Sequence, residues 1–170
     1  MNMNTLKSYT VKGIIFVLIT GTLAHFVYEW SGNNFVLGFF FPVNESVWEH
    51  MKLSFFPMLL YSFYMNRKIS RDYPCVTSGL IFGTLLSAFL IPVFFYTYSG
   101  ILGRNYAALD IGIFIISVLI GFAAVYRLAL SCKLEPCTQT LKLFLLITAV
   151  CFFVFTYHPL QIGIFSVPGK

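Results

Sequence analysis

The side chains that could do chemistry are few, and they lie at the ends of apolar stretches. The chain has three histidines and six acidic residues. All three histidines and four of the acids lie on one predicted side of the protein: His25, Glu29, Glu45, Glu49, His50, Asp110 and His158. Imidazole and carboxylate groups bind transition metals such as zinc, and a neighbouring carboxylate can move a proton. Metal-assisted chemistry at this end is therefore the first functional hypothesis.

The composition indicates the environment that surrounds these residues. Of the 170 residues, 58% are hydrophobic and 10% are charged, whereas an ordinary soluble domain has roughly 25% charged residues. So few charges could not cover a soluble fold, and so apolar a sequence excludes intrinsic disorder. The sequence predicts a single integral membrane domain over residues 1–170, with the lipid bilayer as its partner.

Five apolar stretches are long enough to cross a bilayer as helices, which takes about 20 residues each. They are apolar on all sides and lack the alternation of a membrane β-barrel. The predicted fold class is an all-α polytopic membrane bundle of about five helices, with approximate spans 12–30, 44–65, 75–98, 107–130 and 141–157. The first stretch continues to Trp30, so we expect a retained span and not a cleaved signal peptide. Small residues at Gly79, Gly83 and Ser87 predict close helix packing.

The basic residues predict the orientation of these spans. Eight of the eleven Lys and Arg residues fall on one side: Lys7, Lys12, Arg67, Lys68, Arg71, Arg127, Lys133 and Lys142. Basic loops favour the cytoplasmic side of a membrane. We therefore expect a multi-pass cell-membrane protein with a cytoplasmic amino terminus and an outer carboxyl terminus. This bias also accounts for the net charge of +5, so no nucleic-acid partner is expected.

The second span begins with unusually polar sequence. Asn44 and Ser46 are typical helix caps, and acids are favourable near a helix amino terminus. Polar residues nevertheless continue to Lys52 and occupy about half of the helix circumference, which indicates a polar interior. The preceding residues 31–43 are too short to cross and too apolar for a free loop, and predict a re-entrant or interfacial segment covering the cluster.

The four cysteines show no pattern of a disulfide or zinc site. Cys75, Cys132 and Cys137 lie at predicted cytoplasmic ends, and Cys151 lies within the fifth span. Disulfides are rare in the cytosol, and the spacing of these residues is not a zinc-ligand signature. We expect unpaired thiols.

One part of the chain resembles a known family. The residues that carry the resemblance are His25 to Glu29 and the stretch from Pro42 to Lys52, PVNESVWEHMK. They resemble a family of small, uncharacterised bacterial multi-pass membrane proteins, which implies a bacterial cell membrane and no particular activity. The three histidines with Asp110 are also similar in chemistry to the zinc site of the alkaline ceramidase and adiponectin receptor superfamily. The paired histidines of that family's last helix are absent, because His158 stands alone.

Three functions fit the polar cluster, and the sequence leaves open whether the protein is an enzyme. The first is a metal-dependent membrane hydrolase acting on a lipid or peptide bond near the outer leaflet, with zinc as the candidate metal. The second is a subunit that binds or transports a small solute or cation, and the third is an accessory protein whose cluster is a structural ion network. Haem ligation by His25 and His158 is a weaker alternative. In the hydrolase, His25, His50, Asp110 and His158 would be ligands and Glu45 or Glu49 the base; further polar-site residues are Glu29, Asn44, Trp48 and Lys52.

All three functions share one geometric prediction. The charged groups His25, Glu29, Glu45, Glu49, His50 and Asp110 should lie near one another, with the first, second and fourth spans in contact. Charged groups facing lipid at this depth are costly, so they must face inward and find partners. We expect at least one contact between a carboxylate and an imidazole, made by Glu29 or Glu49.

Overall fold

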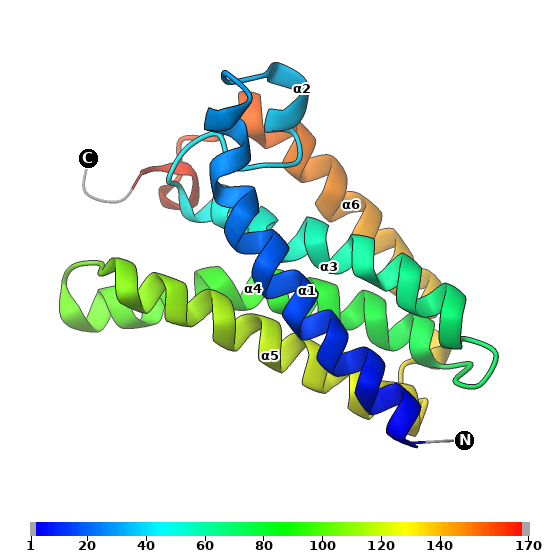
Figure 1. The fold of residues 1–170 in the computed structure, drawn as a ribbon. Helices are drawn as coiled ribbons and strands as arrows, with labels where there is room; N and C mark the ends of the chain where they lie inside the picture. The colour runs from blue at the N-terminus through cyan, green and yellow to red at the C-terminus, as the bar shows by residue number, and fades with distance from the viewer. Residues whose placement is uncertain (1–2, 168–170) are drawn as a thin grey trace.

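The computed structural model describes residues 3–167, and it is helical without a strand in this range. Its helices are α1 (Met3–Trp30), α2 (Phe35–Gly38), α3 (Val47–Ile69), α4 (Val76–Leu102), α5 (Ala107–Ser131) and α6 (Thr138–Tyr157), with 3-10 turns η1 (Glu135–Cys137) and η2 (Gly163–Phe165) (Figure 1). The predicted all-α class is confirmed. The long helices match the predicted stretches closely, except that α1 begins at Met3 and not near Lys12.

Four helices of the described chain are long and apolar enough to cross a membrane. They are α1, α4, α5 and the stretch Glu135–Tyr157 that contains α6. The second predicted span, 44–65, corresponds to α3, which has 23 residues but is less apolar. Glu49, His50 and Lys52 lie near its amino-terminal end, where the candidate site is, and Arg67 and Lys68 lie in its last turn.

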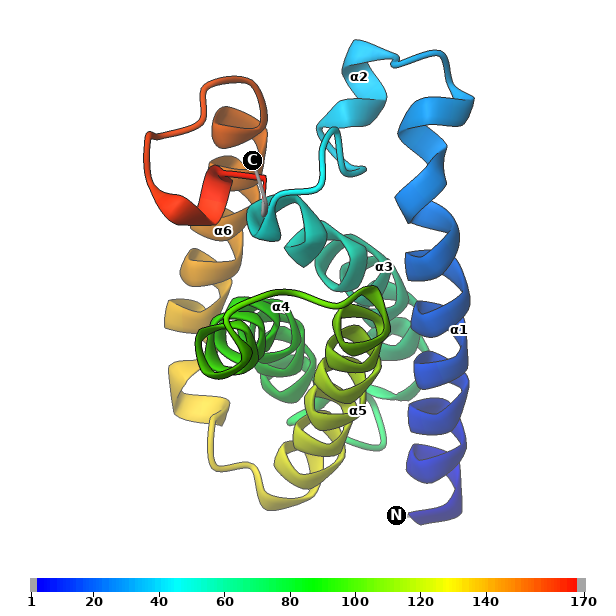
Figure 2. The ribbon, with the colours of Figure 1, turned by 90° about the vertical axis from the view of Figure 1, so that its left-hand side faces the viewer.

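Helix α3 lies at the centre of the bundle. It contacts α1, α4, α5 and α6, and Figure 2 shows it between α1 and α6, above α4 and α5. Met51, Phe55, Met58 and Met65 on this helix are completely buried. Because its neighbours cover most of its surface, α3 can carry polar side chains without exposing them to the surroundings of the bundle.

Helices α4 and α5 form an antiparallel pair whose backbones approach closely. A Cβ atom built on Gly83 would lie 2.7 Å from the carbonyl oxygen of Gly121, and one on Gly121 would lie 2.9 Å from that of Gly83. Such distances are too short for real side chains, so glycine is required at both positions. The close packing predicted from Gly79, Gly83 and Ser87 is confirmed.

A disulfide joins the start of α4 to the end of α5. Cys75 precedes α4, Cys132 follows α5, and their sulfur atoms are bonded across a sequence separation of 57 residues. The expectation that all four cysteines are unpaired is therefore wrong for this pair. The physical reason is that consecutive antiparallel helices bring the start of one beside the end of the next. Cys137 and Cys151 are free.

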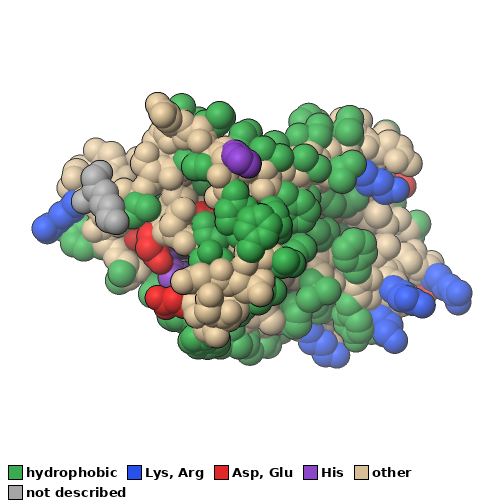
Figure 3. Space-filling model, turned by 90° about the horizontal axis from the view of Figure 1, so that it is seen from above, with side chains coloured by type: hydrophobic (Ala, Val, Ile, Leu, Met, Phe, Trp, Pro, Cys, Tyr) green, Lys and Arg blue, Asp and Glu red, His purple; other side chains and the backbone are tan. Residues whose placement is uncertain are grey.

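Charged side chains separate toward the two ends of the bundle. In the view of Figure 3, most visible Lys and Arg side chains gather at one end, most visible acidic side chains lie toward the other, and hydrophobic side chains fill the middle. The predicted separation of the basic loops from the polar cluster is confirmed.

Residues 31–46 connect α1 to α3 and include the short helix α2, which packs beside α6. The Tyr157 hydroxyl donates a hydrogen bond to the Phe35 carbonyl oxygen at 2.6 Å, and the Phe35 and Tyr157 rings stack. The Asn34 side chain caps α2 by accepting hydrogen bonds from Val36 and Leu37. These contacts fix the path of the chain toward Glu45.

Candidate metal centre

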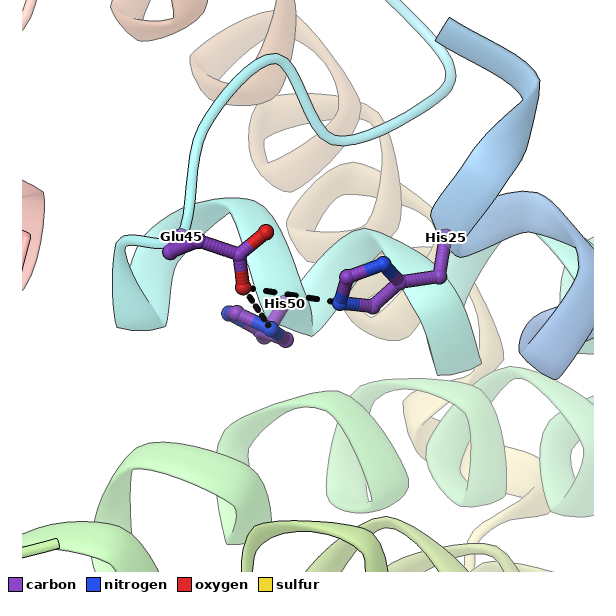
Figure 4. A group of neighbouring side chains, drawn as sticks. All are labelled: His25, Glu45 and His50. Carbon is purple, nitrogen blue, oxygen red and sulfur yellow. Dashed lines mark ion pairs between the residues drawn. The ribbon is translucent and has the colours of Figure 1, made fainter. Parts of the chain in front are cut away.

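His25, Glu45 and His50 come together at the polar end of the bundle. Glu45 Oε2 lies 3.5 Å from His25 Nε2 and 3.3 Å from His50 Nε2. One ligand atom from each residue falls within 4.8 Å of the other two, so the group could hold a metal ion. Figure 4 shows one carboxylate oxygen of Glu45 facing both imidazole rings. The expected contact between a carboxylate and an imidazole is therefore present, but Glu45 makes it; naming Glu29 or Glu49 was wrong.

Three separate parts of the chain position this group. His25 lies on α1, His50 lies in the first turn region of α3, and Glu45 lies in the connection just before α3. The connection is held by local hydrogen bonds, because Ser46 N donates to Asn44 Oδ1 and Glu49 N donates to the hydroxyl oxygen of Ser46. Ser46 is the cap of α3, as predicted, whereas Asn44 accepts a hydrogen bond from Ser46 before the helix and does not cap it. Together they fix the backbone on both sides of Glu45.

The hydrogen bonding of His50 leaves its second nitrogen available as a ligand. Its Nδ1 atom lies 2.9 Å from the carbonyl oxygen of Ser46. A carbonyl oxygen only accepts, so Nδ1 carries a hydrogen, and Nε2 points toward Glu45. In the neutral ring Nε2 carries a lone pair, which would repel the carboxylate unless a proton or a metal cation lay between them. A backbone carbonyl that fixes the tautomer is common for metal-binding histidines.

The spacing of the three side chains suits a small transition-metal ion. Bond lengths of about 2.0–2.2 Å to nitrogen and oxygen place neighbouring ligand atoms of a tetrahedral zinc site about 3.4 Å apart. Both distances from Glu45 to the histidines match this spacing. All three ligand atoms lie within 4.8 Å of one another.

Glu45 is the most accessible member of the group. Its side chain is 63% exposed, compared with 33% for His25 and 27% for His50. A hydrogen bond from His50 and the charges of both histidines hold the pKa of the Glu45 carboxyl below its usual value, against the effect of partial burial. The carboxylate is therefore charged at neutral pH and open to solvent on one side.

Asp110 faces the same space from α5. It lines both cavities that border Glu45 and His50, and its charge acts on His50. The Tyr98 hydroxyl donates a hydrogen bond to Asp110 Oδ1 and accepts one from the Tyr106 backbone at 3.1 Å. Tyr98 thus fixes the orientation of the Asp110 carboxylate. The predicted contacts among the first, second and fourth spans are confirmed, because α1, α3 and α5 contact one another.

Glu49 and Lys52 form a second polar group, buried between α3, α6 and residues 38–43. Lys52 Nζ donates to Glu49 Oε2 at 2.8 Å, to Gly38 O at 3.0 Å and to the Thr156 hydroxyl. Glu49 Oε2 also accepts from Val43 N at 3.0 Å. Thr156, on α6, is the member that the sequence did not indicate, because a hydroxyl on the penultimate residue of an apolar helix is a weak signal. Glu49 therefore pairs with Lys52 and not with the histidines.

The remaining predicted site residues lie outside the metal-ligand group. Glu29 is exposed near the end of α1, and His158 is exposed just after α6. Trp48 is buried against Phe152 and Phe165, and its indole nitrogen has no partner among the described residues. The structure thus brings together two of the three histidines, with Asp110 facing the same cavities.

Comparison with known proteins gives a family and no activity. A family model described as a family of unknown function, DUF6512, matches residues 1–170. No curated protein and no solved structure is significantly similar to the chain.

Proposed function

Because the chain belongs to this family of unknown function, its activity must be argued from the site, and we propose that it is a metal-dependent membrane hydrolase that binds zinc through His25, Glu45 and His50. The observation that carries the proposal is the convergence of three ligand atoms, each within 4.8 Å of the others. Two histidines and one glutamate form a ligand set of catalytic zinc sites, in which water occupies the fourth position.

Asp110 is the general base of this proposal. A bound zinc ion lowers the pKa of a coordinated water to about 7 and polarises a carbonyl oxygen. Asp110 accepts a proton from water while that water's oxygen forms a bond to the carbonyl carbon of an ester or amide. The bond from that carbon to the leaving oxygen or nitrogen then breaks, and Asp110 returns the proton to the leaving atom. Tyr98 orients Asp110 for both transfers.

Metal analysis of the purified protein tests the ligand assignment. We expect about one zinc ion per wild-type chain after incubation with zinc and gel filtration, and little in His25→Ala or His50→Ala, because each change removes one of three ligands. His158→Ala is the matched control, because this exposed histidine lies outside the ligand group. The readout is the zinc-to-protein ratio by mass spectrometry. Equal zinc in all four proteins, or none in the wild type, would overturn the proposal.

A structural ion network is the second candidate function. The observation that favours it is the position of Glu45, whose carboxylate lies within ion-pair distance of both imidazoles. In that case the wild type binds no zinc, and His50→Ala lowers its melting temperature whether or not zinc is added. A metal site instead predicts that zinc raises the melting temperature of the wild type and not that of His50→Ala, because a ligand that binds only the folded state stabilises it.

The topology we propose has five membrane crossings: the four most apolar helices and, in addition, α3. A helix of 23 residues is about 34 Å long at about 1.5 Å per residue, which exceeds the roughly 30 Å hydrocarbon core. Its burial by the other helices allows it to be less apolar than they are. Residues 31–46 form an interfacial segment, which the exposed apolar side chains of Phe35 and Val36 support.

The proposed orientation places the basic end in the cytoplasm of the cell, and Cys137 can report it. Cys137 is free and exposed beside the disulfide at this end. In intact cells that produce Cys151→Ser, we expect a membrane-impermeant maleimide to label Cys137 only after the membrane is opened. The same cells producing Cys137→Ser and Cys151→Ser together are the background control. Labelling of intact cells would reverse the orientation and place the disulfide in an oxidising compartment, where such bonds normally form.

A further inference from the structure

Two cavities meet beside the proposed metal ligands. One of about 360 Å³ lies between α3, α4, α5 and the carboxyl-terminal segment, and one of about 410 Å³ lies between α1, α3 and α5. The residues that line both are Glu45, His50, Leu53, Ala107, Asp110 and Phe114. Small-molecule sites usually measure about 300–1,000 Å³. The polar side chains stand at the junction, so one ligand could reach both cavities from there.

The two cavities have different surroundings. The first is bordered by Asn105 in the exposed connection between α4 and α5. The second is bordered by Phe26 on α1 and Ile111 on α5, whose side chains are 42% and 61% exposed. Both helices are apolar enough to cross a membrane. The first cavity therefore opens near water, and the second opens toward the hydrocarbon of a bilayer.

Gly21 contributes to the shape of the second cavity. It lines the cavity, and a Cβ atom built on it would lie 2.5 Å from the Leu53 carbonyl oxygen and 2.6 Å from the Phe114 ring. Glycine thus allows α1 to pack directly against α3 and Phe114. The cavity has polar side chains where it meets the first cavity, and the apolar side chains of Phe26 and Ile111 lie elsewhere in it. This arrangement suits a molecule with one polar end and one apolar chain.

We propose that the ligand of this site is a membrane amphiphile, with its polar end beside His50 and Asp110 and its apolar chain between α1 and α5. The inference rests on the proposed function for the chemistry at the polar end, whereas the apolar wall of the chain cavity is formed by other residues, Phe26, Ile111 and Phe114. A water-soluble solute would enter by the first cavity and leave the apolar wall of Phe26, Ile111 and Phe114 uncovered. An amphiphile covers that wall and can enter directly from the bilayer.

Photocrosslinking tests where the chain lies. The probe is a phosphatidylcholine with a diazirine in its acyl chain, mixed into vesicles that contain the purified protein. We expect crosslinked peptides that include Leu53, which is 6% exposed and lines the cavity, because lipid around the bundle cannot reach a buried side chain. Ile111→Trp narrows the opening and should reduce crosslinking at Leu53 about tenfold, as for a tenfold loss of affinity.

Two controls separate this inference from the metal proposal. Leu119→Trp adds the same side chain to the same helix at a residue that is 43% exposed and lines neither cavity; it should leave crosslinking at Leu53 unchanged. Wild type treated with a chelator should lose zinc but keep the crosslink, because every residue that lines the chain cavity is unchanged. If the wild type binds zinc but gives no crosslink at Leu53, the amphiphile proposal is wrong and the metal proposal stands. Equal crosslinking in Ile111→Trp and Leu119→Trp would overturn entry between α1 and α5.

Discussion

Replacing Lys52 with methionine should lower the free energy of unfolding by about 3–5 kcal/mol, the usual loss when one partner of a buried ion pair is removed. Lys52 and Glu49 are both almost completely inaccessible to solvent. Without the lysine, the Glu49 carboxylate stays buried with the Val43 amide and the Thr156 hydroxyl as its donors. These cannot balance a full charge, so the folded state is destabilised. Unfolding in a mixed-micelle titration with sodium dodecyl sulfate measures the loss.

Two further variants show whether the loss comes from the unpaired charge. Lys68→Met is the matched control, because Lys68 is an exposed lysine on the same helix; it should change stability by less than about 0.5 kcal/mol. Adding Glu49→Gln to Lys52→Met removes the stranded charge and should recover part of the loss. If Lys52→Met is as stable as Lys68→Met, the pair does not hold the connection before α3 in place.

Asp110→Asn should reduce ester hydrolysis by about 10²- to 10⁴-fold, the contribution of a positioned general base. The amide cannot accept the proton from water, while the three proposed zinc ligands remain. The assay measures release of p-nitrophenol from p-nitrophenyl laurate in mixed micelles with zinc, together with the zinc content. Tyr98→Phe should have a smaller effect, because it loosens Asp110 without removing the carboxylate.

The same experiment decides between two roles for Asp110. Asp72→Asn is the control, because Asp72 is exposed between α3 and α4, away from the cavities. If Asp110→Asn loses zinc together with activity, Asp110 is a metal ligand, as the sequence first suggested. Wild-type hydrolysis by Asp110→Asn would contradict both roles.

Much of the bundle could be predicted from apolar run length, because a bilayer-spanning helix needs a minimum number of apolar residues. The convergence of His25 and His50 followed from the same reasoning, since both lie near helix ends on one side. The acid that contacts these histidines could not be predicted in this way. Ser46 caps α3, so Glu45 lies before the helix and is free to turn toward the histidines. Glu49 lies on the helix and pairs with Lys52 three residues later, a spacing that the sequence already contained.

His158 and the disulfide show what chain position alone leaves undetermined. The sequence placed His158 at the same end as the other histidines. In the bundle α6 lies across α3 from α1 (Figure 2). His158 follows α6, whereas His25 lies on α1. The disulfide departs from the predicted unpaired thiols because helix packing places Cys75 beside Cys132. Cysteines that begin one helix and end the next antiparallel helix are natural partners when the helices pack closely.

The disulfide also determines which parts of the bundle can move. Residues 103–106 join α4 and α5 at the site end, and the Cys75–Cys132 bond joins them at the other end. The two helices therefore form a closed covalent ring and cannot splay apart like an open hairpin. Helix α1 is tied to the bundle only by packing, by hydrogen bonds and by the connection that carries Glu45. Widening of the space between α1 and α5 is thus a movement of α1 against a fixed frame, and it carries His25 away from His50.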